Sequence, residues 1–178
     1  MEKGISMYLV SAYFDNDTTE QLQKYIDIIA EASGNHFMID NNVPPHMTLT
    51  AIEARNADAL LPAFDNLNGK FSPGKISIIS IGQFMPKVIY AAPYINQYLF
   101  ELQQNIFEVF ANIPETNISK FYKPLSWFPH ITLAKTLNKK QMIEAVACMS
   151  EFKELKAEIV RISLASVNPH KDIKGIPD

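Results

Sequence analysis

Segments of alternating or densely apolar residues along the chain predict a series of β-strands. They are short and rich in β-branched and aromatic residues. They occupy 5–14, 46–53, 74–85, 87–93, 130–137 and 155–169. Between them, apolar residues recur with the spacing of a helix, which predicts helices at 18–33, 56–69, 95–113 and 138–152. The helix over 56–69 contains Pro62, which a helix tolerates only near its first turn.

The order of these elements repeats. Strand, helix, strand, helix and strand follow one another in 5–85 and again in 87–169. Such internal similarity indicates duplication. We therefore expect one domain over 1–178 with an α+β fold. It would be bilobal, with two pseudo-twofold-related antiparallel β-sheet lobes, outer helices and a central cleft.

A short motif occurs once in each half. The chain has "VPPHMTL" at 43–49 and "WFPHITL" at 127–133, and both copies contain Pro-His-x-Thr-Leu with an apolar residue at x. Of the four histidines in the chain, His46 and His130 occupy this pattern. A single His-x-Thr would carry little weight, but two matched copies at equivalent places in a repeated topology point to a shared function.

Strand alternation predicts how each copy presents its side chains. Residues i and i+2 share one face of a strand, so His46 and Thr48 lie together and Thr50 extends that face. Met47 and Leu49 then point into the core. The second copy repeats the arrangement with His130 and Thr132. A pseudo-twofold axis would bring both polar faces to one cleft.

Two histidines and two threonines suit chemistry at a phosphorus atom. One imidazole can accept a proton from the attacking oxygen while the other donates one to the leaving oxygen. Threonine hydroxyls can stabilise the non-bridging oxygens. This chemistry needs no metal, and no cofactor is expected.

Other kinds of site fit less well. A metal would need further ligands, and neither motif contains Asp or Glu. No Gly-x-Ser-x-Gly turn supports a serine nucleophile. The single cysteine, Cys148, lies on an apolar helix face and is expected to be a small buried hydrophobe. His36 and His170 are expected in solvated loops, with 168–178 as a frayed tail.

The amino-acid composition and charge limit the kinds of binding partner and the location that we expect. The 178 residues are 47% hydrophobic, carry a net charge of −3 and show no apolar run long enough to span a membrane. Binding of long nucleic acid through its phosphates needs many cations and is not expected. The single cysteine and the lack of an export signal favour a cytoplasmic protein. We expect a monomer.

The paired "HMTL" and "HITL" segments resemble the two-histidine (2H) phosphoesterases, which include 2'-5' RNA ligase-like proteins and cyclic nucleotide phosphodiesterases. "IGQFMPKVIYAAP" (81–93) is similar to the hairpin between the family's lobes. The resemblance implies cleavage of 2',3'-cyclic phosphates or 2'-5' phosphodiester bonds, with 2'-5' RNA ligation as an alternative. It implies an acid–base pair, His46 and His130, and phosphate-binding Thr48 and Thr132.

The resemblance and the residues leave several points open. Many relatives have arginine where this chain has Lys135, which alternation places opposite His130, so a phosphate-binding role for Lys135 is in doubt. A nucleotide or short RNA end is the expected partner, and a binding module without turnover is the competing hypothesis. Aromatic residues that could stack on a base are Tyr8, Phe84, Tyr122, Trp127 and Phe128. Specificity is expected in loops 35–45 and 114–129.

Overall fold

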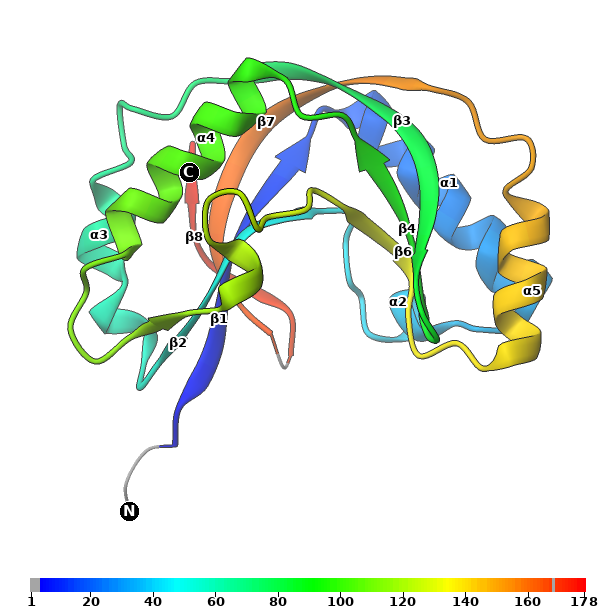
Figure 1. Ribbon diagram of the computed structural model, residues 1–178, viewed down its shortest axis with the longest axis horizontal. Helices are drawn as coiled ribbons and strands as arrows, with labels where there is room; N and C mark the ends of the chain where they lie inside the picture. The colour runs from blue at the N-terminus through cyan, green and yellow to red at the C-terminus, as the bar shows by residue number, and fades with distance from the viewer. Residues whose placement is uncertain (1–3, 168) are drawn as a thin grey trace.

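A computed structural model describes residues 4–167 and 169–178. The described chain forms one antiparallel sheet with helices on its outside (Figure 1). The strands are β1 (Ser6–Phe14), β2 (Met47–Ala54), β3 (Gly74–Phe84), β4 (Val88–Pro93), β5 (Asn117–Ile118), β6 (Ile131–Ala134), β7 (Leu155–Ser166) and β8 (Lys171–Ile176). The helices are α1 (Asn16–Ser33), α2 (Phe37–Asp40), α3 (Leu61–Asp65), α4 (Gln97–Phe110) and α5 (Lys139–Cys148), with 3-10 turns at Ala57–Ala59 and Lys120–Tyr122.

The long strand β7 joins two parts of the sheet. The strand order is β1-β2-β6-β4-β3-β7-β8, and β7 pairs with β1 as well. Its first half pairs with β3 and its second half with β1 and β8. The sheet therefore curves back on itself into the arch of Figure 1. This confirms the expected α+β, bilobal architecture.

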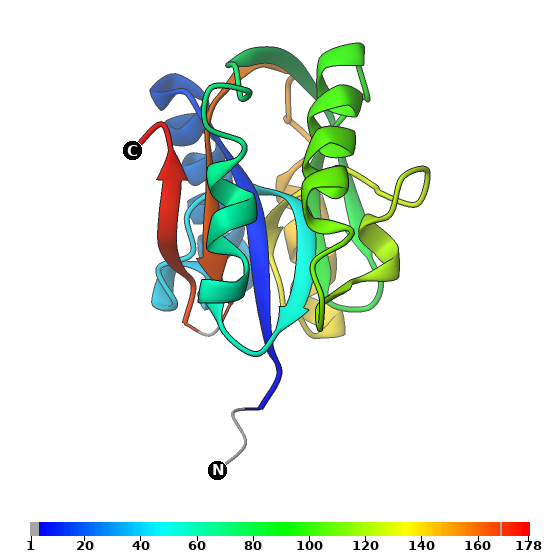
Figure 2. The ribbon, with the colours of Figure 1, turned by 90° about the vertical axis from the view of Figure 1, so that its left-hand side faces the viewer.

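Strand pairing does not stay within the sequence halves. β3 from the first half pairs with β4 from the second, and the two form the predicted hairpin. The placement of lobe boundaries near 5–85 and 87–169 stays a prediction. Two groups of helices cover the outside of the arch. α1 packs on α5 and β6, whereas α4 packs on β2, β3 and α3 (Figures 1 and 2).

Side-chain caps set the helix boundaries. The carboxylate of Asp15 accepts a hydrogen bond from the Thr18 backbone N–H at 2.9 Å, and α1 ends at Gly34, whose φ of 68° is left-handed. Asn138 caps α5 and forms a capping box with Gln141. Asp15, Gly34 and Asn138 are residue types that favour these cap positions.

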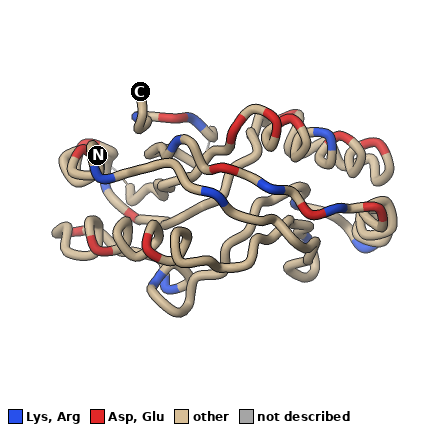
Figure 3. Tube along the Cα trace, turned by 90° about the horizontal axis from the view of Figure 1, so that it is seen from above, with Lys and Arg blue, Asp and Glu red and all other residues tan. Residues whose placement is uncertain are grey.

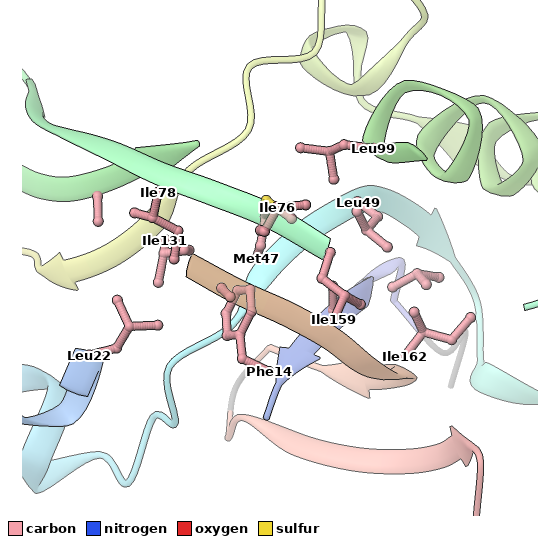
Figure 4. Packing of buried hydrophobic residues seen from close by; sticks show 14 of the residues in the cluster. Phe14, Leu22, Met47, Leu49, Ile76, Ile78, Leu99, Ile131, Ile159 and Ile162 are labelled. Atoms are coloured by element: carbon pink, nitrogen blue, oxygen red, sulfur yellow. The ribbon is translucent and has the colours of Figure 1, made fainter. Parts of the chain in front are cut away.

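The apolar members of both motifs lie in the core. Met47, Leu49, Ile131 and Leu133 are fully buried. Figure 4 shows Leu99 of α4 lying near Leu49. This confirms the inward orientation that strand alternation predicted.

Several expected elements are shorter in the structure, and among them the helices over 95–113 and 138–152 end at Phe110 and Cys148. The helix over 56–69 is broken, because α3 begins only at Leu61 and places Pro62 in its first turn. The strand over 130–137 ends at Ala134, shortly before Thr136 takes a positive φ of 63°. The strand over 155–169 ends at Ser166, and residue 168 lies outside the described residues.

The C-terminal segment is ordered, contrary to the expected frayed tail. β8 pairs with β7 from Ile162 to Ser166, and the backbone hydrogen bonds hold it against the sheet (Figure 2). Within the described residues, no helix is both long and apolar enough to cross a membrane. Along the same residues, Lys and Arg and Asp and Glu are spread over the whole trace (Figure 3).

Candidate functional site

The two motif strands lie side by side. β2 and β6 pair antiparallel with Met47 opposite Ile131, the residues that follow the two motif histidines. Continuing this register by one residue sets His46 opposite Thr132 and Thr48 opposite His130. The four predicted residues therefore gather around one local pseudo-twofold axis.

Both histidine rings are oriented in the same way. Nδ1 of His46 lies 2.8 Å from the carbonyl oxygen of Pro44, and Nδ1 of His130 lies 2.9 Å from that of Phe128. A carbonyl only accepts, so Nδ1 carries the proton in each ring. Nε2 is left as the nitrogen that can exchange a proton with a ligand. The match between the two copies extends to the residue two positions before each histidine.

Burial favours the neutral form of both imidazoles. It lowers the pKa of His46 to about 4, and the nearby charges of His170, His130 and Lys135 add to the effect. Burial also lowers the pKa of His130. In each case the hydrogen bond to the backbone carbonyl opposes the shift. Near pH 7 the free protein thus presents two neutral imidazoles with available Nε2 atoms.

The threonines differ in exposure. Thr48 is buried, at 9% exposure, whereas Thr132 is half-buried. The Tyr122 side chain lies near Thr48: burial raises the pKa of Tyr122, and its hydrogen bond with Thr48 opposes that shift. Thr50 does not extend an accessible polar face, because its hydroxyl is buried and has no hydrogen-bond partner among the described residues.

Aromatic rings surround His130. The ring centroids of Phe84, Tyr90 and Phe128 lie 4.9, 5.7 and 6.4 Å from that of His130. A pocket of about 360 Å³ opens beside them. It is lined by Phe84, Phe121, Tyr122, Ser126, Phe128 and His130. Three of the predicted stacking residues therefore line one pocket: Phe84, Tyr122 and Phe128.

Tyr8 and Trp127 do not line this pocket. Trp127 is 8% exposed and donates its indole N–H to the Thr48 carbonyl at 3.0 Å, so it anchors loop 114–129 to β2. Its burial corrects the expectation that it could stack on a base. Tyr8 packs against the hydrophobic core. Sequence reasoning missed Tyr90, whose ring occupies the space above Gly82, where a Cβ would lie 2.5 Å from its hydroxyl.

A second cluster lies on the His46 side and was not predicted. The ring of His170 lies 4.8 Å from that of His46, centroid to centroid. The Tyr13 hydroxyl lies 3.2 Å from Nε2 of His170 and donates to Asp172 at 2.8 Å. His170 is therefore half-buried against the motif histidine, which corrects its expected place in a solvated loop. Its spacing of two residues from Asp172 was the available sequence signal.

Lys135 is also closer to the site than alternation suggested. β6 ends before it, so strand alternation no longer decides its direction. Its ammonium lies over the Phe37 ring at 4.7 Å, and its charge lowers the pKa of both His46 and His170. Over the described residues, no group of three or more His, Cys, Asp or Glu side chains is arranged to hold a metal ion.

Comparisons with known proteins show that the fold has been seen before. The fold is similar to that of E. coli LigT in complex with 3'-AMP, with a TM-score of 0.60 and 15% identity over 92% of this chain and 88% of that one. It is also similar to TT0787 of Thermus thermophilus, with a TM-score of 0.59 and 14% identity over 95% and 96% of the two chains. No curated protein matches the sequence significantly.

The sequence itself carries the family assignment. Residues 18–170 match the 2'-5' RNA ligase superfamily, and this span contains both His-x-Thr motifs and most of the described strands. The resemblance drawn from the two motifs is thereby confirmed. The chain belongs to the 2'-5' RNA ligase superfamily, among the two-histidine phosphoesterases.

Proposed function

We propose that the protein is a metal-independent phosphodiesterase that hydrolyses 2',3'-cyclic phosphates or 2'-5' phosphodiester bonds of nucleotides or short RNA. The observation that carries the proposal is the Met47–Ile131 pairing, around which two His-x-Thr motifs meet with both Nδ1 atoms tied to backbone carbonyls. E. coli LigT, which has the same fold, was crystallised with the nucleotide 3'-AMP.

The different surroundings of the two histidines suggest how a nucleotide would lie. The aromatic pocket beside His130 suits a base, because Phe84 and Phe128 offer ring faces and edges. The polar cluster of Tyr13 and His170 lies beside His46. The nucleoside oxygen that leaves phosphorus would then be near His130, and the attacking water near His46.

In this arrangement, Nε2 of His46 accepts a proton from water as the water oxygen attacks phosphorus. The bond from phosphorus to the ribose oxygen breaks on the opposite side, and that oxygen takes a proton from Nε2 of His130. The negative phosphate favours the imidazolium form that His130 needs for this step. Thr48 and Thr132 would donate hydrogen bonds to the non-bridging oxygens.

Turnover of a 2',3'-cyclic nucleotide in the presence of EDTA tests the reaction. His46→Ala and His130→Ala should each lower kcat/KM by at least about a hundredfold. His36→Ala is the matched control, since His36 is exposed and lies outside the cluster. Full activity in both motif variants would refute the assignment. Saturable binding without product would favour a binding module, and joining of a 2',3'-cyclic phosphate end to a 5'-hydroxyl end would show ligation.

A substrate with a better leaving group distinguishes the general acid from the general base. The nitrophenolate released from bis(p-nitrophenyl) phosphate needs no proton, and one nitrophenyl ring can occupy the aromatic pocket beside His130 as the leaving group. This substrate should therefore restore most of the rate of the variant that lacks the general acid. We expect it to rescue His130→Ala and not His46→Ala. Rescue of His46→Ala alone would reverse the two roles and contradict the orientation proposed for the nucleotide.

A further inference from the structure

His170 is held firmly beside His46 by a network centred on Asp172. The Asp172 carboxylate accepts hydrogen bonds from Tyr13 at 2.8 Å, Ser163 at 2.9 Å and Arg161 at 2.6 Å. The Arg161 guanidinium lies directly over Gly175, where a Cβ would come within 2.2 Å of it. The network thus connects β1, β7 and β8, and the β7–β8 connection delivers His170 to it.

The direction of the hydrogen bonds sets the proton positions on His170. The Tyr13 hydroxyl has one proton, which it donates to Asp172. It must therefore accept from Nε2 of His170, which consequently carries a proton. Burial lowers the pKa of His170, and the Asp172 carboxylate at the end of this series of hydrogen bonds partly opposes that shift by favouring the protonated imidazole. The same ring lies against His46, tilted by 32°.

Charged and titratable groups approach this ring pair from several elements. Most of them can carry positive charge, and the carboxylate of Asp172 is already bonded to Arg161. They are Tyr13 of β1, Arg161 of β7, Asp172 of β8, Lys135 after β6 and His130 before β6. A cation on His170 therefore acts on His46 with little local compensation.

We propose that His170 is a positioning residue for His46. The ring of His170 packs against the ring of His46, and Tyr13 connects His170 to Asp172. His170 thereby places a second imidazole that can take up a proton beside His46. Below pH 6.5, where His170 takes up a proton, its charge disfavours protonation of His46 and so keeps the motif histidine ready to accept a proton. Removing the charge of His170 therefore lets His46 bind a proton at higher pH. The inference takes His46 to be the proton acceptor of the proposed reaction.

The experiment is an NMR titration of the histidine side chains in the wild type, His170→Phe, Tyr13→Phe and the control His36→Ala. Phenylalanine keeps a flat ring against His46 and removes the charge. We expect the pKa of His46 to rise by at least about 0.5 in His170→Phe. Tyr13→Phe should give a smaller rise, because it breaks the connection of His170 to Asp172. The control should leave the titration of His46 unchanged.

Turnover supplies a second readout. In His170→Phe, the acid limb of the kcat/KM profile should move to higher pH by the same interval as the NMR titration. An unchanged His46 titration in a folded His170→Phe variant overturns the inference, since a purely structural role would lower activity without moving either curve. The NMR measurement does not depend on turnover. A protein that lacks the proposed activity but shows the shift would refute the function and leave the positioning role supported.

Discussion

The stability of the protein should fall between pH 7 and pH 5 because His46 is buried in its neutral form. Burial lowers the pKa of His46 from 6.5 to about 4. In the unfolded chain the pKa of His46 returns to its ordinary value, so His46 binds a proton near pH 6.5. In the folded protein it binds this proton only near pH 4. The contribution to stability is fully present above pH 6.5 and is lost as the pH falls toward 4.

The size of this loss follows from the two pKa values. At pH 5 the unfolded state is almost fully protonated at His46 and the folded state is almost entirely neutral. The linkage relation then gives a loss of roughly 2 kcal/mol in the free energy of unfolding at pH 5 relative to pH 7. Asp15 and Asp172 have lowered pKa values, so their contributions are lost only at still lower pH.

Urea unfolding at both pH values measures the effect. Wild type should lose roughly 2 kcal/mol more than His46→Gln between pH 7 and pH 5, since glutamine does not titrate in this range. His130 and His170 also have lowered pKa values, and the comparison between the two proteins removes their shared contribution. His36→Ala should match the wild type. An equal loss in wild type and His46→Gln would refute the buried, neutral state of His46.

Three further substitutions test the supports of the site. Trp127→Phe removes the indole N–H that is bonded to the Thr48 carbonyl. The free energy of unfolding measured in urea should fall by about 1–3 kcal/mol, and a fall of less than about 0.5 kcal/mol would contradict the anchoring role. Gly82→Ala should displace the Tyr90 ring and raise the KM for a cyclic nucleotide several-fold. The control Gly4→Ala has open space around it and should leave KM unchanged. Equal KM values in the two variants would count against the aromatic pocket. Thr50→Val removes a buried hydroxyl that has no hydrogen-bond partner among the described residues. Urea unfolding should therefore show unchanged stability or a gain of up to about 1 kcal/mol. A clear loss of stability would reveal a partner of this hydroxyl.

Local periodicity explains why much of the fold could be predicted. The repeat of two residues in a strand is enough to separate Met47 and Leu49 from the polar motif residues, and both proved fully buried. Helix ends were predictable where a cap has its own chemistry, as at Asp15 and Gly34. The break in the helix over 56–69 also had a local cause in Pro62.

Contacts made only in the folded chain account for what the sequence did not reveal. β8 has too few apolar residues to be identified as a strand, and its order comes from pairing with β7. His170 reaches His46 only through that pairing. Trp127 and Phe128 are adjacent in sequence, yet one is buried and the other half exposed at the pocket. The path of an irregular loop decides between them, and residue type alone does not.

The two motifs are nearly identical, and their surroundings are what differ. His46 is flanked by His170 and Tyr13, which are brought by the C-terminal segment and β1. His130 is flanked by Phe84 and Phe128, from the β3–β4 hairpin and the preceding loop. Acid–base catalysis needs one imidazole that accepts a proton while the other donates, and two equivalent environments would not distinguish them. Duplication can supply the matched pair of histidines, but only these non-equivalent neighbours can give the two members different roles.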